Sequence, residues 1–190
     1  MQHKAKKFST RARVITSAAA LAVVGAGTVG AMSASAESPA TAPAAAHAPA
    51  SVRGKLTTTS THLSVDAATD AARAAMNAAK KEGQKVSVAV VDRDGNTIVT
   101  LRGDGAGPQA YESAVKKAYT AVSWNAPTSD LVKRLDQAPT LKDIPDTLFL
   151  AGGAPVDYKN APIAGIGVAG APSGDLDEKF AQAGVASLNG

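Results

Sequence analysis

The stretch at residues 109–125, QAYESAVKKAYTAVSWN, decides how the chain is interpreted, because a proline lies on either side of it. Pro108 suits the first turn of a helix, where its missing N–H removes no hydrogen bond, and Pro127 disfavours helical geometry in the residue before it. The pattern therefore predicts a helix with sharp limits. One face of this helix is apolar. The adjacent face combines polar, charged and aromatic side chains, namely Ser113, Lys117, Thr120 and Trp124. An ordinary surface helix with its polar side towards water is the alternative interpretation.

Charge is spread unevenly along the chain, which has 20 basic and 16 acidic residues. Five of the basic residues lie within the first 36 residues, which hold no acidic residue, so the remainder carries 15 basic and 16 acidic residues. A nearly neutral domain has no electrostatic basis for binding nucleic acid or an anionic membrane. We therefore expect no nucleic-acid partner.

Residues 1–36 have the pattern of a secretory signal peptide: a basic start, an apolar run and a small-x-small site that ends at Ala36. We expect cleavage after Ala36 and a secreted, extracellular protein. A transmembrane anchor is the alternative, because the apolar run approaches the length that spans a bilayer. Arg11 and Arg13 are not adjacent, so the export route stays open between the general and the twin-arginine pathways.

Two further regions follow the leader. Residues 37–62 are rich in Ala, Pro and Thr and have few large apolar side chains, which predicts a disordered tether. His47 and His62 lie in this stretch, and an isolated histidine in such a segment is usually just solvated. Residues 63–190 have the length of one folded domain.

Hydrophobic periodicity in this domain predicts an α+β fold with a mostly antiparallel five-stranded sheet flanked by helices. The predicted strands are 85–91, 97–102, 148–151, 155–158 and 163–169. The first helix, from Ser64, has a packing face made mostly of alanine, which buries little area per residue and suggests that the chain is a homo-oligomer. Asp175 and Glu178 predict a capping box at the last helix, and the glycines at 165, 167 and 170 leave room for a close approach to the last strand.

Residues with catalytic or metal-binding chemistry are scarce. From residue 63 onward the chain has no histidine and no cysteine, which excludes Ser-His-Asp and Cys-His catalysis and haem held by His or thiolate. Oxygen ligands and lysines remain, with Met76 as the thioether of the domain. No catalytic constellation is visible, so whether the protein is an enzyme stays open.

Four stretches resemble the GlcG/HbpS family in the same order along the chain. They are VAVVDRDGN at 88–96, Ser113 with KAYTA at 117–121, GGAPV at 152–156, and IGVAG at 166–170 followed by Asp175. The resemblance covers residues 63–186. It implies a homo-oligomeric domain that binds haem, can release iron from it, and influences a membrane sensor histidine kinase through the ectodomain of that kinase.

The resemblance also implies a haem site on the helix at 109–125. The haem-ligating threonine of the family falls on Thr120, and Lys117, one turn earlier, would pair with a haem propionate; Ser113 and Tyr111 lie on the same helix. Tyr111 or Tyr119 is the alternative iron ligand, if Thr120 bonds only the carbonyl one turn back. Two other functions stay open: an enzyme of small-molecule metabolism, and a cofactor-free interaction module that binds the sensor.

Overall fold

The structure is a computed structural model that describes residues 51–189. The signal peptide expected at residues 1–36 lies outside the described residues, as does the tether up to residue 50. Residues 51–62 are exposed and include one short 3₁₀ helix, η1 (Gly54–Leu56). Within residues 51–189, no helix combines the length and the apolar character needed to cross a bilayer.

The strand β1 (Ser87–Asp92) lies inside the sheet because its side chains are apolar on both faces. Val88 and Val90 join the core on one face, and Ala89 and Val91 join the core on the other. The order of the sheet is β2-β1-β4-β3 with every pair antiparallel, and the other strands are β2 (Thr97–Arg102), β3 (Gly153–Tyr158) and β4 (Ala161–Ala169). Burial on both faces shows that helices must cover the sheet on each side.

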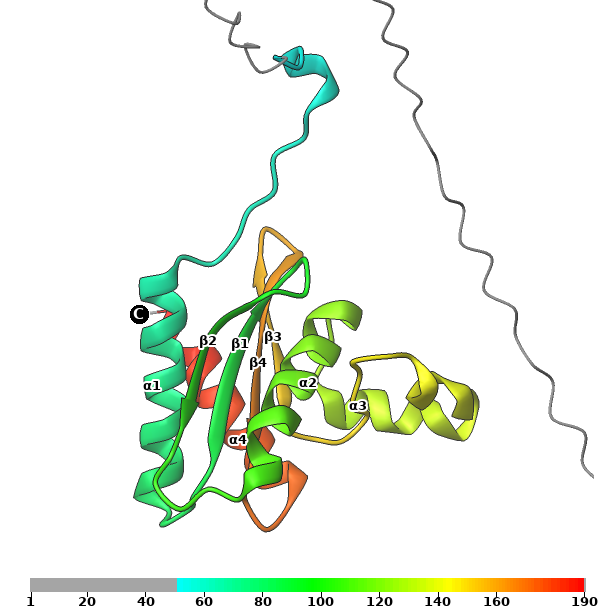
Figure 1. The fold of residues 1–190 in the computed structure, drawn as a ribbon. Coiled ribbons are helices and arrows are strands. Elements are labelled where there is room, and N and C mark those ends of the chain that lie inside the picture. Colours follow the sequence, from blue (N-terminus) through cyan, green and yellow to red (C-terminus); the bar gives the residue numbers. More distant parts are fainter. Residues whose placement is uncertain (1–50, 190) are drawn as a thin grey trace, which may run out of the picture. The chain divides into compact units, whose positions relative to one another are not determined.

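Three layers result, as Figure 1 shows. Helix α2 (Pro108–Trp124) covers one face of the sheet, and α1 (Val65–Lys81) and α4 (Gly174–Ala186) pack together on the other. The remaining elements are α3 (Thr128–Val132) and the 3₁₀ helices η2 (Lys133–Asp136), η3 (Pro139–Asp143) and η4 (Ser187–Asn189). The predicted α+β class is thus confirmed.

The sheet has four strands in the described part of the chain, so the prediction of a fifth strand at residues 148–151 is wrong. The N–H of Leu148 donates to the side-chain oxygen of Thr120 (2.8 Å) instead of to a neighbouring strand. The ring of Phe149 packs edge-on against Trp124, with centroids 5.2 Å apart. Contacts with α2 therefore hold this apolar segment in an irregular conformation.

The alanine face of α1 is covered within the subunit. Ala68, Ala72 and Ala75 are fully buried, and a Cβ added to Gly184 of α4 would come within 3.3 Å of the Ala75 side chain. Small side chains on both helices allow this close packing. The face therefore gives no evidence for association between subunits, and the homo-oligomer stays a prediction from the resemblance.

Two glycines of β4 let α2 lie directly on the sheet. A Cβ at Gly167 would overlap the carbonyl of Ala114, and one at Gly165 would overlap the carbonyl of Ala118. The room that these glycines leave is thus occupied by the backbone of α2. This contact fixes the height at which the residues of α2 stand above the sheet.

Candidate functional site on helix α2

Helix α2 begins at Pro108 and ends where Asn125 adopts a left-handed conformation (φ 48°), close to the limits predicted from the two prolines. The four residues predicted for the haem site do not meet at one place. Ser113 and Lys117 line a cleft, Thr120 is enclosed in the interior, and Tyr111 lies at the surface beside β2.

Lys117 forms a buried ion pair with Asp177 of α4. Its Nζ lies 2.8 Å from Oδ2 of Asp177 and donates a second hydrogen bond to the carbonyl of Val168 (3.1 Å). Lys117 and Asp177 are only 2% and 3% exposed, respectively. Burial raises the pKa of Asp177, although the Lys117 ammonium and the N–H of Ala171 act in the opposite direction. Lys117 therefore links the two helical layers and is not free to pair with a propionate at the surface.

An open cleft of about 340 Å³ lies beside this ion pair, where β4 ends. Its lining includes Gln109, Ser113, Lys117, Leu150, Gly170 and Asp177. The volume is near the lower limit of typical ligand pockets. The cleft would thus suit a small polar molecule better than a macrocycle.

Thr120 is fully buried, and both sides of its hydroxyl are engaged. Its Oγ1 donates to the carbonyl of Lys116 (2.7 Å) and accepts from the N–H of Leu148 (2.8 Å). The first of these bonds is the local helical bond weighed above as the alternative role of this threonine. Ligation of iron by Thr120 stays a prediction, and it requires the segment around Leu148 to move away from α2.

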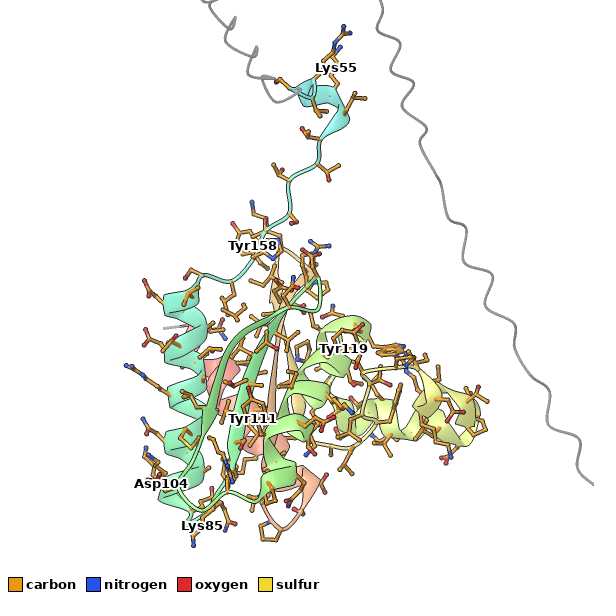
Figure 2. All side chains as sticks on the ribbon, viewed as in Figure 1. Lys55, Lys85, Asp104, Tyr111, Tyr119 and Tyr158 are labelled. Atoms are coloured by element: carbon orange, nitrogen blue, oxygen red, sulfur yellow. The ribbon has the colours of Figure 1, made fainter. Side chains whose placement is uncertain are left out.

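Tyr119 borders a second hollow, of about 250 Å³, on the other side of α2. Gly95, Lys116 and Asp146 also line it. Asp146 stands two residues before Leu148, so this hollow adjoins the segment that covers Thr120. Figure 2 shows Tyr119 and Tyr111 far apart along α2, and Tyr111, 48% exposed, accepts a hydrogen bond from Thr100 at 3.3 Å.

Asp177 was not singled out in the sequence, and the capping role predicted for Glu178 is wrong. Glu178 is not part of a capping box, because Ser173 caps α4 by accepting from the N–H of Leu176 (3.2 Å). The Glu178 carboxylate instead accepts from the N–H of Ser129 (2.9 Å) and that of Gly152 (3.3 Å). Adjacent acids in the first turn of a helix indicate a favourable dipole interaction, and nothing in that pattern shows which of them turns inward.

Comparison with known families decides the assignment. The family described as haem-degrading protein, HbpS-like, matches residues 63–186. The chain belongs to this HbpS-like family. The structure of a double mutant of HbpS from Streptomyces reticuli is 73% identical, with a TM-score of 0.75, and the match covers 75% of this chain and 98% of that one. The comparison with curated proteins gave no match.

Two more distant structures have the HbpS-like fold. PduOC, solved as a complex with haem, is 28% identical with a TM-score of 0.62, covering 68% of this chain and 96% of that one. A Klebsiella pneumoniae protein, ORFY, is 24% identical with a TM-score of 0.66, over 73% of this chain and 98% of that one, and shows a shared fold alone.

The donor groups on α2 fit haem in their chemistry. Tyr119 has a phenol oxygen and borders the hollow, Thr120 has a hydroxyl that is engaged in the interior, and phenolate is a known axial ligand of haem. Lys116 lies at the same hollow as Tyr119 and pairs with Glu112 at 2.7 Å on the surface. Of the two lysines, Lys116 is the one at the surface, so it is the one that would meet a propionate.

Proposed function

We propose that the folded domain binds haem beside α2, at the hollow of Tyr119 and Lys116, and that the protein acts outside the cell. The match of the HbpS-like family over residues 63–186 is the observation that carries the proposal. The haem complex of the related PduOC supports it. Bound haem would supply a redox-active iron, and release of that iron is the reaction that the description of the family suggests.

The iron ligand in this proposal is an oxygen of α2, from Tyr119 or Thr120. Tyr119 already lines the hollow and would hold the iron there, whereas Thr120 would become available only when Leu148 withdraws its N–H. Asp146, at the border of the hollow, has a positive φ of 63°, a backbone conformation that non-glycine residues seldom adopt. The segment from Asp146 to Leu148 is therefore where we expect the protein to open for Thr120.

A haemin titration followed by absorption spectroscopy tests the proposal. Thr120→Val removes the hydroxyl and keeps the shape of the side chain, and Thr120→Ser keeps the hydroxyl. If Thr120 is the ligand, the Soret band moves in Thr120→Val alone, and the wild-type iron is high-spin because a neutral hydroxyl is a weak ligand. If Tyr119 is the ligand, a phenolate charge-transfer band disappears in Tyr119→Phe.

Tyr111→Phe is the matched control, because Tyr111 lies outside the hollow. Loss of affinity without a spectral change in Thr120→Val would indicate only that the Leu148 segment has loosened. Wild-type protein that gives no Soret change with haemin would refute haem binding.

Association between subunits is part of the proposal. A hollow of about 250 Å³ is smaller than typical ligand pockets, so it cannot enclose a macrocycle by itself. A second copy of the chain would cover the exposed part of the haem. Sedimentation with and without haemin tests this, and a monomer under both conditions would refute it.

A membrane sensor histidine kinase is the partner that we propose, through its ectodomain, on the basis of the resemblance. A pull-down with the purified ectodomain tests this partner, and comparison of haem-free with haem-loaded protein shows whether haem controls the contact. If the haem-free protein binds the ectodomain and haemin gives no Soret change, the cofactor-free interaction module is favoured.

The cleft beside Lys117 and Asp177 favours the second candidate, an enzyme that acts on a small molecule. Its size and its buried charges suit a small polar substrate better than haem. Ser113→Leu would fill this cleft without touching the hollow of Tyr119. Unchanged haemin binding in this variant separates the two sites.

A further inference from the structure

His62 is not isolated, although its place in the tether suggested a solvated side chain. One potential ligand atom from each of His62, Asp92 and Asp94 lies within 4.8 Å of the other two. The cluster joins two segments about 30 residues apart. Oxygen and imidazole nitrogen together form a donor set that suits divalent transition metals.

The fold brings these residues together at one end of the sheet. His62 stands just before Ser64, whose side chain caps α1 by accepting from the N–H of Ala67 (3.2 Å). Asp92 closes β1, and Asp94 lies in the turn that leads to β2. Figure 1 shows that α1 begins at the end of the sheet where this turn lies.

The turn orients the Asp92 carboxylate. Its Oδ1 accepts from the backbone N–H of Asp94 (2.9 Å) and from that of Asn96 (2.8 Å). Its Oδ2 has a longer bond from the side-chain amide of Asn96 (3.2 Å) and faces His62. One oxygen is therefore held by the backbone, while the other is directed at the imidazole. Such outer hydrogen bonds are what fix the ligands of metal sites.

The ring of His62 lies between the two carboxylates, with one nitrogen towards each, and neither separation is that of a direct charge-assisted hydrogen bond. Nδ1 of His62 is 3.7 Å from Oδ2 of Asp92, and Nε2 is 3.4 Å from Oδ2 of Asp94. Charge-assisted N–H···O bonds are typically about 2.7–2.9 Å long. Ligand atoms around a tetrahedral zinc ion with bonds of about 2.0–2.2 Å stand about 3.4 Å apart.

We propose that His62, Asp92 and Asp94 form a surface site for a divalent transition-metal ion such as zinc, completed by water. One imidazole nitrogen and one oxygen of each aspartate bind the ion. Ser60, whose Oγ lies 2.5 Å from Nε2 of His62, turns aside or bonds a metal-bound water. A bound ion fastens the exposed segment that ends at His62 to the turn between β1 and β2.

This site is independent of haem binding, although Gly95 of the same turn borders the hollow of Tyr119. None of the three proposed metal ligands lines that hollow. A test on haem-free protein therefore separates the two proposals, because a failed haemin titration leaves the metal titration interpretable.

Isothermal titration of zinc chloride into the haem-free full chain, without a polyhistidine tag, tests the site. We expect one equivalent to bind, with the affinity reduced by about tenfold or more in His62→Ala and in Asp94→Asn. His47→Ala and Asp104→Asn are the matched controls and keep the wild-type affinity. Calcium chloride binds much more weakly, because calcium prefers ligands that are all oxygen.

Three outcomes would overturn the proposal. The first is no stoichiometric binding of zinc, and the second is zinc binding that survives both His62→Ala and Asp94→Asn. The third is that calcium binds as tightly as zinc and that His62→Ala has no effect. That result would show only that cations associate with the two carboxylates without the imidazole. Thermal unfolding of each variant without metal confirms that the fold is intact, since His62 and Asp94 lie at the surface.

Discussion

The ion pair between Lys117 and Asp177 gives the sharpest prediction of stability. With Nζ and Oδ2 2.8 Å apart, attraction at an effective dielectric constant of 20 is about 6 kcal/mol. Removing both charges from water costs several kcal/mol for each ion, so the net contribution of the pair is about zero. Removing one partner is different, because the other charge is then buried without compensation.

We therefore expect Lys117→Met and Asp177→Leu each to lower the free energy of unfolding by about 3–5 kcal/mol. The double variant, which has neither charge, should unfold within about 1 kcal/mol of the wild type. Urea denaturation at pH 7, followed by far-ultraviolet circular dichroism, measures all four proteins. Single losses below about 1 kcal/mol, or additive losses in the double variant, would refute the reasoning.

The two single variants should respond differently to acid. Burial raises the pKa of Asp177, and the Lys117 ammonium acts against that rise. Lys117→Met removes the ammonium, so the pKa rises further and the folded state binds a proton more tightly than the unfolded state. The stability lost in Lys117→Met should thus return as the pH falls towards 3.8, the ordinary pKa of the carboxyl. In Asp177→Leu the carboxyl that takes up the proton is absent, so acid should restore nothing. Equal recovery in both variants would contradict the assignment.

Three further predictions concern packing, a buried carboxylate and processing. Gly167→Ala should destabilise the fold by about 3 kcal/mol in urea denaturation, because its Cβ would overlap the backbone of α2, whereas Gly54→Ala, with open space around it, should have no measurable effect. Glu178→Gln should cost about 2 kcal/mol, because an amide replaces the carboxylate that accepts from the N–H of Ser129, and a cost near zero would show that this contact is dispensable. Mass spectrometry of culture supernatant should give a chain that begins immediately after Ala36, and a full-length chain in the membrane would support the anchor instead.

Local sequence chemistry predicted the elements whose limits are set by neighbouring residues. The two prolines around α2 defined its ends, and the predicted strands 155–158 and 163–169 lie within β3 and β4, which Lys159 and Asn160 join with positive φ angles. The apolar segment at 148–151 was mistaken for a strand, because its conformation depends on a hydrogen bond to Thr120, 28 residues away from Leu148. A pattern of apolar residues cannot show that a distant hydroxyl takes the N–H that a strand would need.

The candidate site shows the same limit. Lys117 was placed correctly on α2, but its partner lies 60 residues along the chain, so the sequence could not show that the ammonium is buried. His62 appeared solvated for the same reason, since Asp92 comes close to it only because the end of β1 and the start of α1 lie at the same end of the sheet. Composition was more informative: residues 63–190 hold no histidine and no cysteine, so an iron ligand from this part of the chain is an oxygen, a lysine amine or the Met76 thioether.

The contact between α2 and the glycines of β4 restricts how this helix can move. The carbonyl of Ala114 already lies against Gly167, so the helix has no compressible layer of side chains beneath it. Moving inward is sterically blocked, and moving outward exposes Ala114 and Ala118, which are buried. The positions of Ser113 and Tyr119 are therefore set by main-chain geometry, and a ligand arriving at α2 meets a rigid platform whose adjustable part is the segment at 146–150.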